Sequence, residues 1–143
     1  MVRYFGMLIL VGFIAFPVLG HGSENPKNLF VIVTSDDPVT QLMSMVLATQ
    51  ASKKGAGVDV LLCGEAGSLA VRDSPEILLK PNNKSPQMLL NKLIQNGVNV
   101  EICPPYLPNN DKTASDLIDG VSVAKPPEVA DRLLREDTNI LSY

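Results

Sequence analysis

The stretch Asn-Leu-Phe-Val-Ile-Val-Thr-Ser-Asp-Asp-Pro, residues 28–38, decides the fold. Its first seven residues form an apolar run rich in β-branched side chains, which is typical of a strand buried on both faces of a sheet. Asp37 and Pro38 then indicate a helix N-terminus, because aspartate caps free N–H groups and proline at the first helical position has none to lose. Apolar residues recur at helical spacing before Lys53-Lys54-Gly55, at Val39, Leu42, Met43, Val46 and Leu47. The sequence therefore predicts a buried strand followed by an amphipathic helix.

A second apolar strand, residues 57–63, follows this helix, and the order strand, helix, strand requires parallel pairing with a right-handed crossover. The rest of the chain continues to alternate. We expect a surface loop over 64–84, a helix from Ser85 to Gly97, a strand over 98–103, an irregular proline-rich loop over 104–110, a short helix over 113–120, a strand over 121–123, a helix from Pro126 and a strand over 138–143. This pattern predicts the α/β class: a single-domain, three-layer α/β/α sandwich around a mostly parallel five-stranded sheet.

The first twenty residues are typical of a secretory signal peptide and not of a folded domain. Arg3 precedes an uncharged apolar stretch, residues 4–19, and the small residue Gly20 provides a cleavage position. Cleavage there would leave residues 21–27 as a flexible N-terminus and residues 28–143 as one domain, too short for two. We therefore expect an exported protein, periplasmic or secreted, with an uncleaved N-terminal anchor as the alternative.

Composition excludes several classes of function. The chain carries 12 Lys and Arg against 15 Asp and Glu and has no basic cluster, so we expect no nucleic-acid partner. Its one histidine, His21, precedes the domain, which excludes a Ser-His-Asp triad and leaves too few ligands for a metal site. Residues 35–38 are acidic and residues 64–68 lack the glycine spacing of a phosphate-binding loop, so we expect no nucleotide and no other cofactor. After the signal segment, no apolar run is long enough to cross a membrane.

Candidate site residues follow the predicted strands, because the functional crevice of a parallel α/β sheet lies beyond the carboxyl ends of its strands. Ser35 and Asp36 follow the first strand, and Cys63 ends the second. Cys103 ends the third strand, with Tyr106 in the proline-rich loop beyond it. Both cysteines of the chain are therefore expected at the same edge of the sheet. Polar residues that alternate with apolar neighbours along the strands are expected at solvent-facing or strand-end positions: Asp59, Asn99 and Glu101.

Four segments share their pattern with one family: Leu29 to Ser35, Ser85-Pro86 with Leu89 and Leu90, Asn96 to Pro104, and Leu117 to Val121. In these segments the chain resembles the DsrE/DsrF-like, or YchN-like, family, whose members take part in sulfur transfer. The resemblance implies that Cys103 is the catalytic residue and holds sulfane sulfur as a persulfide. It also implies a homo-oligomer, and a small sulfur species or the thiol of a partner protein as the reaction partner. The sequence departs from the family because Tyr106 and Leu107 stand where many relatives have a second cysteine.

The cysteine pair has three alternative states. In an oxidising compartment Cys63 and Cys103 would form a disulfide if the second and third strands are neighbours, since adjacent strands lie within bridging range. Alternatively, Cys103 is a reactive thiolate that attacks a persulfide donor and passes the sulfur to an acceptor thiol, as in a sulfurtransferase-like carrier. In the third state both are inert buried thiols. A structural or inert pair would correspond to a second function, a non-catalytic exported binding or assembly module with the same fold.

Overall fold

One parallel sheet organises the chain in the computed structural model, which describes residue 1 and residues 27–143. The strands lie in the order β4-β3-β2-β1-β5, and every neighbouring pair is parallel. Their bounds are β1 (Asn28–Val33), β2 (Gly57–Leu62), β3 (Asn99–Ile102), β4 (Val121–Val123) and β5 (Thr138–Ser142). The predicted α/β class and five-stranded sheet are confirmed. The expected signal peptide and all but the last residue of the expected N-terminal tail, His21 included, lie outside the residues that the structure describes, apart from Met1.

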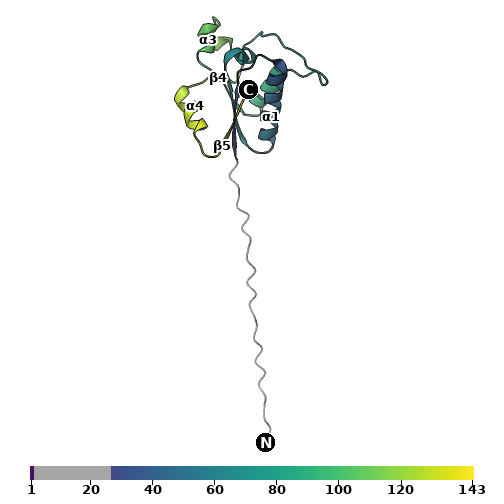
Figure 1. The fold of residues 1–143 in the computed structure, drawn as a ribbon, viewed down its shortest axis with the longest axis vertical. Helices are drawn as coiled ribbons and strands as arrows, with labels where there is room; N and C mark the ends of the chain where they lie inside the picture. The colour runs from purple at the N-terminus through teal and green to yellow at the C-terminus, as the bar shows by residue number, and fades with distance from the viewer. Residues whose placement is uncertain (2–26) are drawn as a thin grey trace.

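Helices cover the two faces of this sheet unequally. Figure 1 shows the sheet nearly edge-on, with α1 on one side and α4 on the other. The helical segments are α1 (Pro38–Lys53), η1 (Gly64–Ala70), α2 (Pro86–Gln95), α3 (Tyr106–Asn109), η2 (Ala114–Asp116) and α4 (Pro126–Leu133). No helix in the described part of the chain is both long and apolar enough to span a bilayer. The arrangement is the predicted three-layer sandwich.

The larger core lies between the sheet and the helices α1 and α2. Its fully buried members are aliphatic, as expected of a domain with few aromatic residues, and include Val31, Val33, Met45, Leu62, Leu90, Leu93 and Ile102. A smaller cluster on the opposite face gathers Phe30, Leu61 and Ala124 against α4. Successive side chains along the strands alternate between the two clusters. The continuous apolar strands expected from the sequence are therefore buried on both faces.

Both long helices begin as the sequence predicts. The side chain of Asp37 accepts a hydrogen bond from the N–H of Thr40 at 2.7 Å, and Ser85 Oγ accepts one from the N–H of Met88 at 3.0 Å. A proline follows each cap at the first helical position. These caps fix where α1 and α2 start, at the same edge of the sheet as the candidate site residues.

The expectation of a surface loop over 64–84 is wrong for its first third. Residues Gly64–Ala70 form the 3₁₀ segment η1, in which Ala66, Leu69 and Ala70 are buried. The segment was missed because it is short and contains Gly64 and Gly67, and glycine disfavours helical structure. Residues beyond Val71 are extended or turn structure, as expected.

The proline-rich loop is not wholly irregular either. Tyr106–Asn109 form one helical turn, α3, with Pro105 as its N-cap and Pro108 inside the first turn. Prolines are tolerated there because the first four N–H groups of a helix have no intrahelical partner. The helix expected over 113–120 is only the short 3₁₀ segment η2. Its predicted capping box, between Thr113 and Asp116, is present.

Glu101 was expected at a solvent-facing or strand-end position and is instead buried, with 6 % of its surface exposed. Its carboxylate accepts a hydrogen bond from Nη2 of Arg132 on α4. Nε of Arg132 lies 3.4 Å from Asp59 Oδ1, and the guanidinium lies 5.8 Å from the centre of the Phe30 ring. One arginine therefore neutralises two strand carboxylates and attaches α4 to the sheet.

Removing this arginine should destabilise the domain strongly. Arg132→Met leaves Glu101 buried without a counter-ion, and we expect a loss of about 3–5 kcal/mol in the free energy of unfolding, measured by urea denaturation. The matched double variant Arg132→Met with Glu101→Met should recover much of that loss, since the one carboxylate left without a counter-ion, Asp59, is less buried than Glu101 and keeps its hydrogen bond from Asn99. Equal stability of Arg132→Met and the wild type would contradict this role.

Candidate functional site

The two cysteines lie side by side at the carboxyl edge of the sheet. The parallel register pairs Leu62 of β2 with Ile102 of β3, so the next residue on each strand is a cysteine. The ladder continues through them, because the N–H of Cys103 donates to the carbonyl oxygen of Leu62 at 2.8 Å. Cys63 and Cys103 are joined as a disulfide with their Cα atoms 5.0 Å apart, and neither thiol is free. The second and third strands are thus neighbours, which was the condition for a disulfide between their terminal cysteines.

The disulfide forms part of the wall of an open hollow of about 410 Å³, the disulfide hollow. Both cysteines are half-buried, so this edge is neither sealed in the core nor fully exposed. The other lining residues come from η1 and from the segment around α3: Gly64, Glu65, Pro105, Tyr106, Asn109 and Asn110. A small molecule or a partner's side chain could therefore approach the sulfur atoms from this side.

Tyr106 forms one side of the disulfide hollow and depends on a glycine behind it. A Cβ atom added at Gly67 would overlap the Tyr106 ring, so only glycine allows η1 and the ring to lie this close. Burial raises the pKa of the Tyr106 hydroxyl, and the negative charge of Glu65 raises it further. Tyr106 is thus a neutral hydrogen-bonding group beside the disulfide at ordinary pH.

The other two predicted site residues lie apart from the cysteines. Ser35 shapes the turn before α1: its hydroxyl accepts from the N–H of Asp37 at 3.1 Å, and its carbonyl oxygen accepts from Gln41 Nε2 at 2.8 Å. Asp36 lines a second, smaller hollow of about 140 Å³. Glu65 lines both hollows. The structure therefore brings together Cys63, Cys103 and Tyr106, places Asp36 in the adjoining hollow, and uses Ser35 in the turn.

The sequence analysis did not select Glu65, Asn109 and Asn110. Glu65 follows the second strand by three residues, so its position at the sheet edge could be predicted from the sequence. Nothing in its neighbours indicated that it lies between two hollows. Asn109 and Asn110 reach the site because Tyr106–Asn109 is helical, which the prolines obscured. Within residues 27–143 and Met1, no three His, Cys, Asp or Glu side chains are grouped so as to hold a metal ion.

Comparison with known structures supports the fold expected from the family resemblance. The chain is similar to the ychN protein of E. coli, with a TM-score of 0.67 and 20% identity over 82% of this chain and 99% of that one. It is also similar to a protein of unknown function from Methanobacterium thermoautotrophicum, with a TM-score of 0.60 and 20% identity over 83% of this chain and 100% of that one. No protein-family model matches the sequence, and no curated protein does. At this identity the likeness shows the fold alone.

The electrostatic coupling between Glu65 and Tyr106 is directly testable. Glu65→Gln removes the negative charge, so the pKa of Tyr106 should fall toward its ordinary value while the part due to burial remains. An NMR titration of the Tyr106 ring carbon that bears the hydroxyl measures the shift. The matched control Glu136→Gln removes one charge at an exposed position outside both hollows and should leave the Tyr106 titration unchanged. Identical curves for Glu65→Gln and the wild type would contradict the coupling.

Proposed function

We propose that this protein is an exported sulfur carrier in which Cys103 takes up sulfane sulfur as a persulfide and Cys63 acts as its redox partner. The observation that carries the proposal is the position of both sulfur atoms in the wall of the disulfide hollow, where a visiting molecule can reach them. The fold shared with the ychN protein and the family resemblance around Cys103 favour sulfur chemistry over other thiol chemistry. The disulfide itself agrees with export, because such bonds persist in oxidising compartments.

The carrier cycle begins with opening of the disulfide. A dithiol reductant supplies two electrons, becomes a disulfide itself, and leaves Cys63 and Cys103 as thiols. The Cys103 thiolate then attacks the outer sulfur of a persulfide R–S–SH, which forms Cys103–S–SH and releases R–S⁻. An acceptor thiolate completes delivery by taking the outer sulfur and leaving Cys103 as a thiolate. Uptake and delivery are exchanges of one sulfur atom and need no oxidant.

Cys63 gives the loaded carrier a second outcome. Its thiolate lies beside Cys103 and can attack the inner sulfur of Cys103–S–SH, which re-forms the disulfide and expels HS⁻. This step discharges the carrier when no acceptor arrives. It uses Cys63 from the neighbouring strand in the role that a second cysteine of the same loop would have.

Mass spectrometry of the reduced protein tests the proposal. After treatment with glutathione persulfide, Cys63→Ser should gain one sulfur atom on Cys103 and retain it, since no neighbouring thiolate can expel it. The wild type should instead release hydrosulfide and return to the disulfide. Cys103→Ser, which retains Cys63, is the matched control and should gain no sulfur. Absence of any adduct on Cys63→Ser would overturn the proposal, and equal loading of Cys103→Ser would contradict the choice of Cys103.

The alternative function is an exported binding or assembly module in which the bond only stabilises the fold, and the observed disulfide favours it equally. The two functions differ in how the folded protein responds to a reductant. A structural bond should resist a mild dithiol, so that a thiol-alkylating reagent labels neither cysteine until the protein is unfolded. A carrier should be opened and alkylated on both cysteines while still folded.

Removing the bond should cost stability under either function. The disulfide closes a segment with a sequence separation of 40 residues. The chain-entropy model then predicts a loss of about 4 kcal/mol in the free energy of unfolding for Cys63→Ser with Cys103→Ser. Urea denaturation of the oxidised wild type and the double variant measures this difference. The reduced wild type is the control and should match the double variant, because both lack the cross-link.

A further inference from the structure

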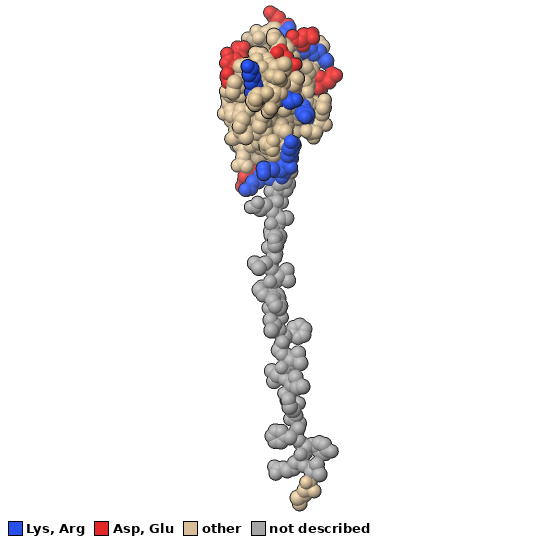
Figure 2. Space-filling model, turned by 90° about the vertical axis from the view of Figure 1, so that its right-hand side faces the viewer, with Lys and Arg blue, Asp and Glu red and all other residues tan. Residues whose placement is uncertain are grey.

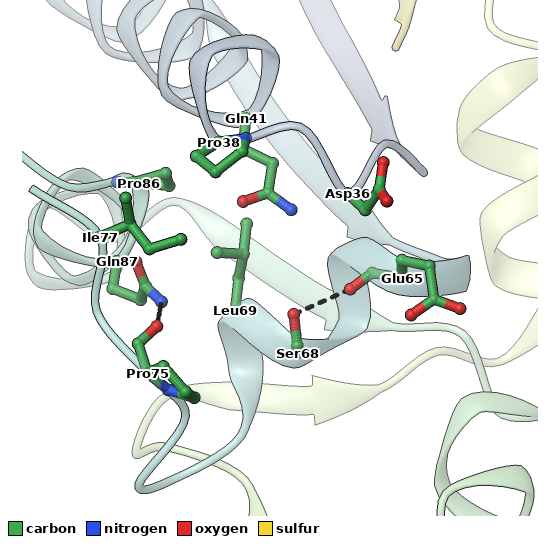
Figure 3. A pocket seen from close by; sticks show the side chains of 10 residues that line it. All are labelled: Asp36, Pro38, Gln41, Glu65, Ser68, Leu69, Pro75, Ile77, Pro86 and Gln87. Carbon is green, nitrogen blue, oxygen red and sulfur yellow. Dashed lines mark hydrogen bonds between the residues drawn. The ribbon is translucent and has the colours of Figure 1, made fainter. Parts of the chain in front are cut away.

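The smaller hollow, of about 140 Å³, lies where the first turns of α1 and α2 meet η1 and the loop that follows it. We call it the amide hollow, after the two glutamine side chains that Figure 3 shows on its walls. Its lining residues are Asp36, Pro38, Gln41, Glu65, Ser68, Leu69, Pro75, Ile77, Pro86 and Gln87. The proposed sulfur chemistry uses none of them, although Glu65 also borders the disulfide hollow.

The orientation of both glutamine amides is fixed by the backbone. Gln41 has only 5 % of its surface exposed, and its Nε2 donates to the carbonyl oxygen of Ser35 at 2.8 Å. Gln87 Nε2 donates in the same way to the carbonyl oxygen of Pro75 at 2.9 Å. A carbonyl oxygen can only accept, so neither amide can be turned the other way without losing its bond. The nitrogen of each amide therefore points to the wall.

The two amide oxygens are consequently left as free acceptors. Gln87 Oε1 is buried and accepts no hydrogen bond within the described residues. The oxygen of Gln41 also has no donor in the described part of the chain, but unlike that of Gln87 it is not fully enclosed, and Figure 3 shows it above Leu69, on the side away from Asp36. Because buried polar atoms are almost always paired, the enclosed oxygen of Gln87 points to a ligand that supplies donors, and the oxygen of Gln41 is open to the same ligand.

The remaining polar groups of the amide hollow also favour a donor. Asp36 and Glu65 contribute carboxylates, and the hydroxyl of Ser68 already donates to the carbonyl oxygen of Glu65 at 2.8 Å. None of the ten lining residues is Lys, Arg or His. Figure 2, which views the α1 side, shows acidic side chains mainly toward the upper end of the domain.

An anion is disfavoured although two helices start here. Pro38 and Pro86 stand at the first helical positions and present rings where other residues would present N–H groups. Two more N–H groups of the first turns, those of Thr40 and Met88, are already used, since they bind the caps Asp37 and Ser85. The helix starts therefore contribute apolar surface to this hollow in place of the anion site that they often form.

We propose that the amide hollow binds an ammonium or guanidinium group carried on a short aliphatic stem. The cationic head would donate to the two amide oxygens, the carboxylates of Asp36 and Glu65 would attract its charge from the other side of the hollow, and the stem would pack against Leu69, Ile77 and the prolines. A bare metal ion fits less well, because apolar side chains occupy much of the wall where it would need oxygen ligands. The cation comes from a free small molecule or from a Lys or Arg side chain of a partner protein.

The position of this site beside the disulfide extends the proposed function. Glu65 lines both hollows, so a molecule anchored by its cation and long enough to pass Glu65 would reach the hollow of Cys63 and Cys103. That consequence rests on the sulfur-carrier proposal. The binding itself does not, since none of the lining residues is a cysteine.

NMR titration of the ¹⁵N-labelled, oxidised protein tests the proposal without using sulfur chemistry. The probes are butylguanidinium and butylammonium, with neutral butylurea as the isosteric control. The side-chain NH₂ signals of Gln41 and Gln87 should shift saturably with the two cations and not with butylurea. No shift at millimolar cation, or equal shifts with butylurea, would overturn the proposal.

Variants locate the binding in this hollow. Asp36→Asn with Glu65→Gln should weaken butylguanidinium binding by about tenfold or more, as expected when two negative charges that attract the cation are removed. Gln87→Met, which removes one unpaired oxygen, should also weaken binding. The control Glu136→Gln should bind like the wild type. Equal weakening by Glu136→Gln would show attraction to the net charge only and would overturn the site. Unchanged binding in both hollow variants would do the same.

A second pair of probes separates the two sources of the cation. An acetylated and amidated Gly-Arg-Gly peptide is compared with its citrulline analogue, which is neutral and has the same shape. Tighter binding of the arginine peptide than of butylguanidinium would support a side chain of a partner protein. Equal or weaker binding of the peptide would support a free small molecule. Binding of the citrulline peptide as tight as that of the arginine peptide would contradict a cation site.

Discussion

The register between β2 and β3 is the constraint on which the candidate site depends. Parallel pairing of Leu62 with Ile102 leaves one residue on each strand at the edge, and both are cysteines. A shift of one residue would place one sulfur on each face of the sheet, because side chains alternate along a strand. The buried faces prevent this shift, since it would turn either Val60 and Leu62 of β2 or Val100 and Ile102 of β3 out of the larger core. Core packing therefore fixes the distance between the two sulfur atoms.

Much of the fold could be predicted from the sequence because local signals and burial agree there. The apolar run of residues 28–34 and the Asp37-Pro38 start of α1 each point to one structure by themselves. The prediction and the structure differ where a residue's surroundings come from a distant part of the chain. Glu101 looks like a polar residue of an alternating strand, and only the position of Arg132, on a helix 31 residues away, makes its burial tolerable.

The candidate site was predictable in its centre and not at its borders. Cys63, Cys103 and Tyr106 follow from strand ends and topology, since parallel strands bring their carboxyl ends to one edge. The borders depend on η1 and α3, two short segments whose glycines and prolines hide their helical turns. The division into two hollows at Glu65 follows from how η1 turns after Gly64, whose φ of +52° suits glycine far better than other residues. No periodicity in the sequence carries that information.

The way the two cysteines are held decides what opening the disulfide would do to the fold. The N–H of Cys63 donates to the carbonyl oxygen of Val33 at 2.9 Å, and that of Cys103 donates to Leu62. Both backbones are therefore held by the sheet independently of the sulfur–sulfur bond. On the α4 side the half-buried sulfurs pack against the cluster that contains Phe30 and Leu61. Since these contacts do not require the bond, reduction can free the thiols while the strands keep their register. The same sheet edge can thus hold either a cross-link or two thiols, and the redox conditions around the protein select between them.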